Sequence, residues 1–94
     1  MQCAEVLFSD HAIAQMFKRD IGISDIRHII ATGEAINEYP DDKPYPSFLL
    51  LGFIQTRPIH VVIARNTENE RCIIITAYEP DQAIWEAHFR IKKK

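Results

Sequence analysis

Three polar side chains stand in two otherwise apolar runs of the sequence, residues 58–65 and 71–80. They are His60 in the first run, and Thr76 and Tyr78 in the second. A histidine can take or give a proton near neutral pH, because its ordinary pKa lies close to that range. A tyrosine hydroxyl can orient a substrate or donate a proton. These side chains are therefore the first candidates for chemistry in this chain.

The two runs predict a β-hairpin, because each is rich in β-branched residues and a short polar segment of Asn, Thr and Glu separates them. Both faces of each run are apolar, which is typical of strands in the middle of a sheet that is covered on both sides. The polar groups in these strands are thus expected close to the core.

The register of this hairpin decides which side chains meet. We prefer a register that pairs Arg65 with Arg71, although the turn contains no Asn-Gly pair to fix it. This register places His60 opposite Thr76 and on the same face as Tyr78. A slip of one residue separates His60 from both hydroxyls.

A second group of candidate residues lies on a predicted helix near the N-terminus. Ser9 can cap this helix, and apolar residues recur after it at helical spacing. His11, Gln15 and Arg19 follow one another at intervals of four residues, so they lie on one side of the helix. We treat that side as a candidate functional face.

The other elements follow from hydrophobic periodicity and turn residues. The pattern predicts a short strand or extended arm over residues 5–8, a second helix over 24–33, strands over 34–39 and 48–55, and a last helix that begins at Pro80 and Asp81. Residues 40–46 include three prolines and predict a loop. The predicted fold is α+β, with two N-terminal helices packed on an antiparallel sheet of about four strands and a C-terminal helix.

Length and composition predict a single domain over residues 1–94, since 47% of the residues are hydrophobic and chains of this size rarely divide. The net charge of −2 argues against a broad basic surface for nucleic acid. We expect Cys3 and Cys72 to be free thiols in a reducing compartment. The sequence shows neither a signal peptide nor about 18 uninterrupted apolar residues, so we expect a cytoplasmic protein without a membrane span.

Several classes of site find little support in the sequence. A metal site built from Cys3, His11 and His60 is conceivable, but the chain has no Cys-x-x-Cys or His-x-x-x-His spacing. No Gly-x-Ser-x-Gly motif marks a serine hydrolase, and three glycines are too few to build a phosphate-cradling loop. We therefore predict no metal and no cofactor.

Several short motifs follow one another along nearly the whole chain. They are Phe8-Ser9-Asp10-His11-Ala12, Arg19, Ile23-Ser24-Asp25-Ile26, Gly33-Glu34, Tyr39-Pro40, Pro58-Ile59-His60-Val61-Val62 and Ile75-Thr76-Ala77-Tyr78-Glu79-Pro80-Asp81. In this order and spacing the chain resembles the bacterial domain-of-unknown-function family 4258. Members of that family resemble the small ribonuclease toxins of the RelE/ParE type, and some are encoded beside antitoxin-like partners. The resemblance implies two helices with an antiparallel sheet, and a role in RNA cleavage or translation.

The first functional hypothesis is a toxin-like, metal-independent endoribonuclease. Such an enzyme must deprotonate a 2′-hydroxyl, stabilise the phosphate and protonate the leaving 5′-oxygen. The catalytic roles are assigned to His11, His60 and Tyr78, and the RNA-phosphate contacts to Arg19, Arg65 and Arg71. The turn after Arg19 is two residues longer than the Arg-Gly-Ile turn common in the family, which shifts this arginine relative to the sheet. The implied partners are RNA, an antitoxin-like protein and a second copy of the chain.

The second hypothesis is a non-catalytic module of the same fold that binds a protein partner. A histidine on an apolar strand is more often buried and satisfied by a neighbouring polar group than catalytic. A tyrosine there is more often part of the core, with its hydroxyl at the rim. Burial of His60 and separation of His11 from Tyr78 favour this module, whereas convergence of the three beside Arg19 in an open cleft favours the enzyme.

Overall fold

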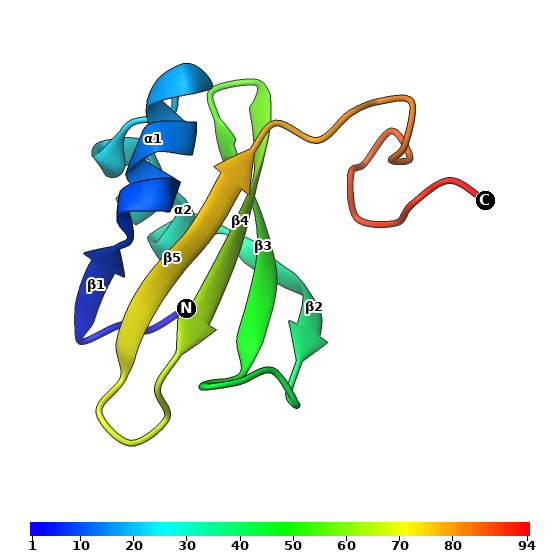
Figure 1. The fold of residues 1–94 in the computed structure, drawn as a ribbon. Helices are drawn as coiled ribbons and strands as arrows, with labels where there is room; N and C mark the ends of the chain where they lie inside the picture. The colour runs from blue at the N-terminus through cyan, green and yellow to red at the C-terminus, as the bar shows by residue number, and fades with distance from the viewer.

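Two short helices pack on one face of a curved, five-stranded sheet (Figure 1). The computed structural model describes residues 1–94. In chain order the elements are β1 (Glu5–Phe8), α1 (Asp10–Lys18), α2 (Ile23–Thr32), β2 (Glu34–Tyr39), β3 (Ser47–Ile54), β4 (Arg57–Arg65) and β5 (Arg71–Tyr78). The predicted α+β class and both N-terminal helices are confirmed.

The strands lie side by side in the order β1-β5-β4-β3-β2. Strands β2 to β5 form an antiparallel meander, as predicted. Strand β1 pairs with β5 in parallel, so the sheet has five strands and is mixed, and the expectation of a purely antiparallel sheet is wrong at this edge. Four residues carry little periodic signal, and it is contacts with distant residues, among them the packing of Val6 and Phe8 against the core, that place this strand.

The central strand β4 is buried on both faces, as its sequence predicts. Ile59, Val61 and Ile63 point toward the helices and belong to the main hydrophobic core, and none of the three is exposed to solvent. Burial of each such side chain contributes about 1.5–3 kcal/mol. Because successive strand residues point to opposite faces, His60 and Val62 lie on the other side of the sheet.

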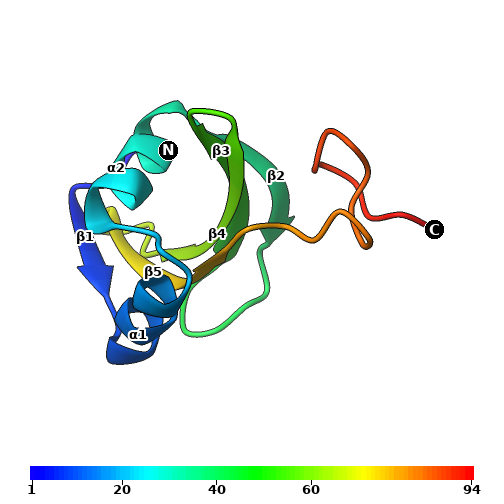
Figure 2. The same ribbon diagram turned by 90° about the horizontal axis from the view of Figure 1, so that it is seen from above.

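Each helix has a clear start and a buried stripe. The Ser9 hydroxyl accepts a hydrogen bond from the Ala12 backbone N–H at 3.0 Å and caps α1, whose Ala12 and Met16 are buried. Helix α1 packs on β5, and α2 packs on β3 and β4 through its buried Ile26 and Ile29. Both helices lie on the same side of the sheet (Figure 2). Neither has the length or the apolar run that a membrane crossing requires.

The predicted C-terminal helix is not formed, and residues 79–94 instead make turns. The Asp81 carbonyl accepts bonds from the N–H groups of Ile84 and Trp85, and the chain then folds back so that Trp85 bridges to Lys92. A helix of about 12 residues is marginal in water without tertiary support. Here the folded-back segment lies on the side of the sheet away from the helices (Figure 2), where the Trp85 ring and the Phe89 carbonyl contact His60.

Cys3 and Cys72 are joined in a disulfide, so the expectation of two free thiols is wrong. Their Cα atoms lie 5.7 Å apart although 69 residues separate them in the sequence. The parallel pairing of Val6 with Cys72, and a bond from the Ala4 N–H to the Glu70 carbonyl at 2.8 Å, bring the two cysteines together. The disulfide is at odds with the reducing compartment on which that expectation rests.

The register of the β4–β5 hairpin differs from the one we preferred. Arg65 pairs with Cys72 instead of Arg71, and His60 lies opposite Tyr78 instead of Thr76. A bulge between Val62 and Ile63 shifts the pairing partway along the ladder. The bulge explains why a uniform register taken from the two sequences alone fails.

Replacement of Gly52 tests the contact between the sheet and α2. A Cβ atom at Gly52 lies 2.7 Å from two side-chain carbons of Ile29, closer than real contacts allow. We expect Gly52→Ala to lower the free energy of unfolding by about 1–3 kcal/mol, because the buried Ile29 has little room to move. Urea denaturation followed by circular dichroism measures this change.

Gly22→Ala is the matched control for this substitution. The nearest atom to a Cβ at Gly22 is a side-chain oxygen of Asp25 at 3.5 Å, which is ordinary contact. Gly22 is the N-cap of α2, where alanine is less favourable than glycine, so we expect a loss of only about 0.5–1 kcal/mol. Equal stability of the two variants contradicts the close packing of α2 on β3.

Candidate functional site

The sheet face opposite the helices brings two of the predicted site residues together. His60 in β4 lies directly between Tyr78 in β5 and Leu51 in β3. In the neighbouring row of the same face, Val62 in β4 pairs with Leu49 in β3. A small apolar surface with one histidine and one tyrosine results, and the C-terminal segment packs on it.

His60 is fully buried, and both of its ring nitrogens have partners. Its Nε2 lies 2.8 Å from the carbonyl oxygen of Phe89, and its Nδ1 lies 3.3 Å from the hydroxyl of Tyr78. A carbonyl can only accept, so Nε2 carries the proton and Nδ1 accepts a bond from the Tyr78 hydroxyl. The Trp85 ring closes the site edge-on, with its centroid 4.5 Å from that of His60.

The surroundings of this pair shift both of its pKa values. Burial lowers the pKa of His60 below its ordinary value of 6.5, and the hydrogen bond to Phe89 opposes that shift. Burial raises the pKa of Tyr78 above 10.0, with a further rise from nearby Tyr39 and an opposing effect of Arg19. At neutral pH the imidazole is therefore neutral and the phenol keeps its proton. In this state the Tyr78 hydroxyl donates a hydrogen bond to His60 Nδ1.

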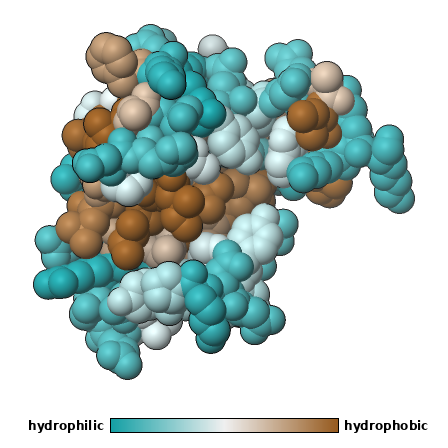
Figure 3. Space-filling view, in the orientation of Figure 1, coloured by the Kyte–Doolittle hydropathy of each residue, from teal (hydrophilic) through white to brown (hydrophobic).

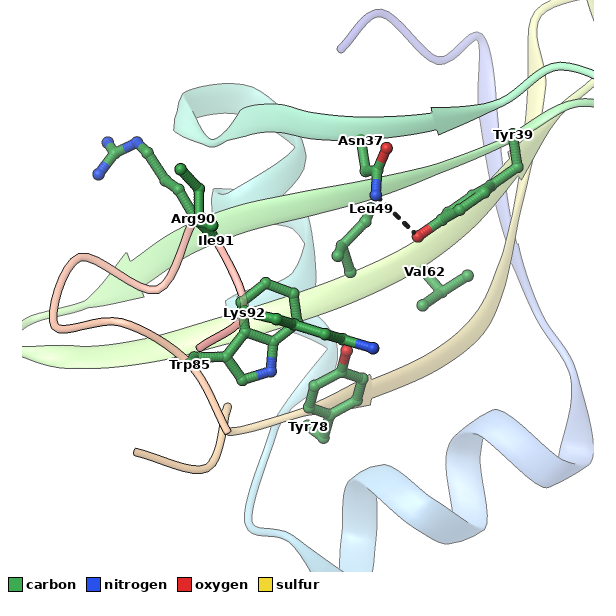
Figure 4. Close-up of a pocket in the computed structure, with 9 residues that line it drawn as sticks. All are labelled: Asn37, Tyr39, Leu49, Val62, Tyr78, Trp85, Arg90, Ile91 and Lys92. Atoms are coloured by element: carbon green, nitrogen blue, oxygen red, sulfur yellow. Dashed lines mark hydrogen bonds between the residues drawn. The ribbon is translucent and has the colours of Figure 1, made fainter. Parts of the chain in front are cut away.

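A pocket of ≈ 420 Å³ opens beside Tyr78 on this face (Figure 4). It is lined by residues of four strands and of the C-terminal segment: Asn37, Tyr39, Leu49, Val62, Tyr78, Trp85, Arg90, Ile91 and Lys92. Leu49 and Val62 form an apolar part of the wall. The Asn37 amide donates a hydrogen bond to the Tyr39 hydroxyl at 3.3 Å, which holds this partly exposed ring in place. His60 lies behind Tyr78 and does not line the pocket.

The charged groups of the pocket are cations. Lys92 lies over the Trp85 ring, 5.8 Å from its centroid, and its ammonium points toward Tyr78 (Figure 4). The Arg90 guanidinium points away from the other lining residues and makes an ion pair with Glu34 at 2.9 Å (Figure 4). This pairing lowers the pKa of Glu34. No carboxylate lines the pocket, so its electrostatic preference is for an anion.

Arg19 reaches the edge of the strand that carries Tyr78. Its guanidinium donates to the backbone carbonyl of Ala77 at 2.8 Å and to the Thr76 hydroxyl at 3.3 Å. It does not line the pocket. Its bonds tie the end of α1 to β5, next to Tyr78 in the sequence.

The other predicted site residues lie elsewhere. His11 is exposed at the start of α1, eight residues or about 12 Å of helix away from Arg19. Arg65 and Arg71 lie at the far end of the β4–β5 hairpin, where they form ion pairs with Glu70 at 3.1 Å and Glu5 at 3.0 Å. The structure thus brings together His60 and Tyr78 of the predicted catalytic set, and leaves His11 and these two arginines outside their pocket.

Eight of the nine residues that line the pocket, all except Tyr78, were not among the predicted site residues. Asn37 and Tyr39 stand two apart in β2, a spacing that places both on one face of a strand and is visible in the sequence. Trp85 and Lys92 belong to the segment for which a helix was expected, and no sequence pattern shows that this segment folds back over the sheet.

The three residues considered for a metal site, Cys3, His11 and His60, do not converge. Cys3 is part of the disulfide, and His60 lies on the face opposite the helices. No group of three or more His, Cys, Asp or Glu side chains is placed to hold a metal ion.

Comparison with known proteins supports the family resemblance. The family model described as Domain of unknown function (DUF4258) matches residues 8–79, well over half of the chain. The chain belongs to this family. The matched region includes His60 and Tyr78 and ends at the last residue before Pro80, so the folded-back segment of this DUF4258 protein lies outside it. No curated protein and no solved structure matches the chain.

The buried His60 makes the stability of this DUF4258 protein depend on pH. Its pKa is lowered in the folded state, so the unfolded chain binds the proton more readily. His60 therefore contributes stability that is present above pH 6.5 and is lost as the pH falls toward and through the folded pKa. The loss is about 1.4 kcal/mol for each unit by which the pKa is lowered.

Urea denaturation at about pH 7.5 and about pH 5 measures this effect. We expect His60→Gln to lose stability overall and to show a smaller difference between the two pH values than the wild type. His11→Gln, at an exposed position, is the matched control and should keep the wild-type difference. An unchanged difference in His60→Gln contradicts the assignment.

Proposed function

We propose that this protein is a toxin-like, metal-independent endoribonuclease whose active site is the pocket beside Tyr78. The observation that carries the proposal is the composition of that pocket. A proton-transfer pair, Tyr78 with His60 behind it, faces the same cavity as a free cation, Lys92, and a partly exposed aromatic ring, Tyr39. These are the groups that cleavage of an RNA phosphodiester requires.

The pocket suits a nucleotide better than other anions. A phosphate can lie against the Lys92 ammonium, and a base can stack on the Tyr39 ring beside the apolar Leu49 and Val62. The net charge of −2 argues against binding along a broad surface. Attraction of RNA is therefore local to this pocket, where Lys92 is the unpaired cation.

In the proposed reaction the pair acts as a relay base. The 2′-hydroxyl gives its proton to the Tyr78 oxygen while the Tyr78 proton passes to Nδ1 of neutral His60. The 2′-oxygen then bonds to phosphorus, and the bond from phosphorus to the 5′-oxygen breaks. The Lys92 ammonium stabilises the charge on the phosphate, and the leaving 5′-oxygen takes a proton from water. The products are a 2′,3′-cyclic phosphate and a free 5′-hydroxyl.

This scheme changes the roles assigned from the sequence. The assignment of His11 to proton transfer and of Arg65 and Arg71 to phosphate binding has no counterpart at the pocket. Arg19 acts as a positioning residue for β5 instead of a phosphate contact. The proposal also includes the RelE/ParE likeness, which the order of two helices followed by the β2–β5 meander supports.

Removal of the Tyr78 hydroxyl tests the proposed reaction. We expect Tyr78→Phe to lower the rate of cleavage of total bacterial RNA by about 10² to 10⁴-fold, because the relay loses its middle member while the ring stays in place. Gel analysis of RNA incubated with purified protein and a chelator measures the rate. We also expect the wild-type rate to fall as the pH drops through the lowered pKa of His60, where the folded protein takes up a proton at this ring.

Tyr45→Phe is the matched control, because Tyr45 does not line the pocket. It should cleave RNA at the wild-type rate. If folded wild-type protein leaves RNA intact at every pH tested, the ribonuclease proposal fails. Equal rates for the wild type and Tyr78→Phe overturn the assigned role of the pair.

A second candidate function is the non-catalytic interaction module. It is favoured by the burial of His60 and by the separation of His11 from Tyr78, because catalytic groups would be expected to converge in an open cleft. It is also favoured by an uncovered apolar band across β1, β5 and β4, which is visible on the surface (Figure 3). The side chains that form this band include Leu7, Ile73, Ile75 and Val62. An antitoxin-like protein or a second copy of the chain is the partner proposed for it.

Sedimentation of the purified protein tests self-association through this band. We expect a mass above that of a monomer for the wild type and a monomer for Ile75→Glu, because a charge at this 41% exposed position opposes burial. Glu38→Lys, on the distant edge strand β2, is the control and should behave as the wild type does. A monomeric wild type at all concentrations rules out a second copy as the occupant.

A further inference from the structure

We infer that the pocket takes one unpaired nucleotide of a single-stranded RNA, and that Tyr39 is its base-stacking residue. The inference rests on the proposed function and names the substrate class of the same site. Three features of the pocket support it. The pocket is recessed, the Tyr39 ring is held by a hydrogen bond from Asn37, and Lys92 is the one cation of the pocket without an ion-pair partner.

The form of the pocket excludes a paired base. The cavity lies between the sheet and the folded-back segment, with Tyr39 on one side and Trp85 and Lys92 on the other (Figure 4). In an RNA duplex the bases are stacked inside the helix, and their rings are not free to enter such a cavity. A single strand can turn one base out of its backbone and place it there.

Tyr39 is the ring best placed to receive that base. Trp85 is 8% exposed, with the His60 ring perpendicular to it and Lys92 over its ring, so little of the ring is free. Tyr39 is 39% exposed, and its hydroxyl is held by the Asn37 amide. A ring that is held before binding loses little conformational freedom when a base stacks on it.

The charges limit the contact to about one phosphate. Arg90 is engaged by Glu34, which leaves the Lys92 ammonium as the cation that faces the cavity. A single strand that neutralises one phosphate shows a slope of about −0.7 in a plot of log affinity against log salt concentration. We therefore also expect the affinity for the RNA strand to depend only weakly on salt concentration.

Binding of a labelled, unstructured RNA strand to Tyr78→Phe protein, followed by fluorescence anisotropy, tests the inference without cleavage of the probe. We expect the single strand to bind at least about 10-fold more tightly than its duplex with the complementary strand. Adding Tyr39→Ala should weaken binding of the single strand by about 5- to 150-fold. Adding Tyr39→Phe, which keeps the ring, should weaken it far less.

Tyr45→Ala on the same background is the matched control and should bind as the parent does. Equal binding of the duplex and the single strand overturns the substrate class but leaves the ribonuclease proposal in place. An unchanged affinity in folded Tyr39→Ala protein overturns the stacking role of Tyr39 and likewise leaves the ribonuclease proposal in place. Absence of RNA binding of any kind, by contrast, overturns the proposed function itself.

Discussion

The structure depends on a single constraint, which is that the central strand β4 is apolar on both faces and must be covered on both. The two helices cover one face with a continuous core of Ile, Val and Leu side chains. On the other face the folded-back C-terminal segment covers only part of the surface, where Trp85 and the Phe89 carbonyl contact His60. The remaining part of that face forms the pocket and the exposed apolar band. The site is thus a consequence of how much of the second face the short chain can cover.

Long-range ties hold the elements around this strand in place. The disulfide from Cys3 to Cys72 and the parallel pairing of β1 fix one edge of the sheet. At the start of β4, Arg57 donates to the backbone carbonyls of Arg19 and Asp20 and to the Glu79 carboxylate. These bonds join the turn after α1 to the point where the C-terminal segment leaves the sheet. The position of that segment over the second face is therefore coupled to the helices on the first.

Most of the fold follows from local patterns in the sequence. The Ser9 cap, the apolar stripes of both helices and the doubly apolar β4 predict their elements, because each signal lies within a few neighbouring residues. The parallel pairing of β1, the bulge beside Val62 and the disulfide follow from contacts between distant residues. A pattern confined to one segment contains no information about such contacts. For the same reason the direct pairing of His60 with Tyr78 was not among the registers predicted from the sequence.

The candidate site likewise combines residues that the sequence could single out with residues that only the fold brings near them. His60 and Tyr78 could be singled out because a polar side chain buried in an apolar strand requires a hydrogen-bond partner. In the structure each is the partner of the other. Lys92 and Tyr39 could not be linked to them, because they come from a terminal segment and an edge strand.

Burial explains the properties of the pair itself. It keeps His60 neutral and Tyr78 protonated at neutral pH, which is the state that a relay base needs and also the state of a silent pair in a core. What distinguishes these two cases is the surroundings of the Tyr78 hydroxyl. In this protein Tyr78 lines a cavity together with the Lys92 cation and the Tyr39 ring, and the proposed ribonuclease activity depends on this difference from a core pair.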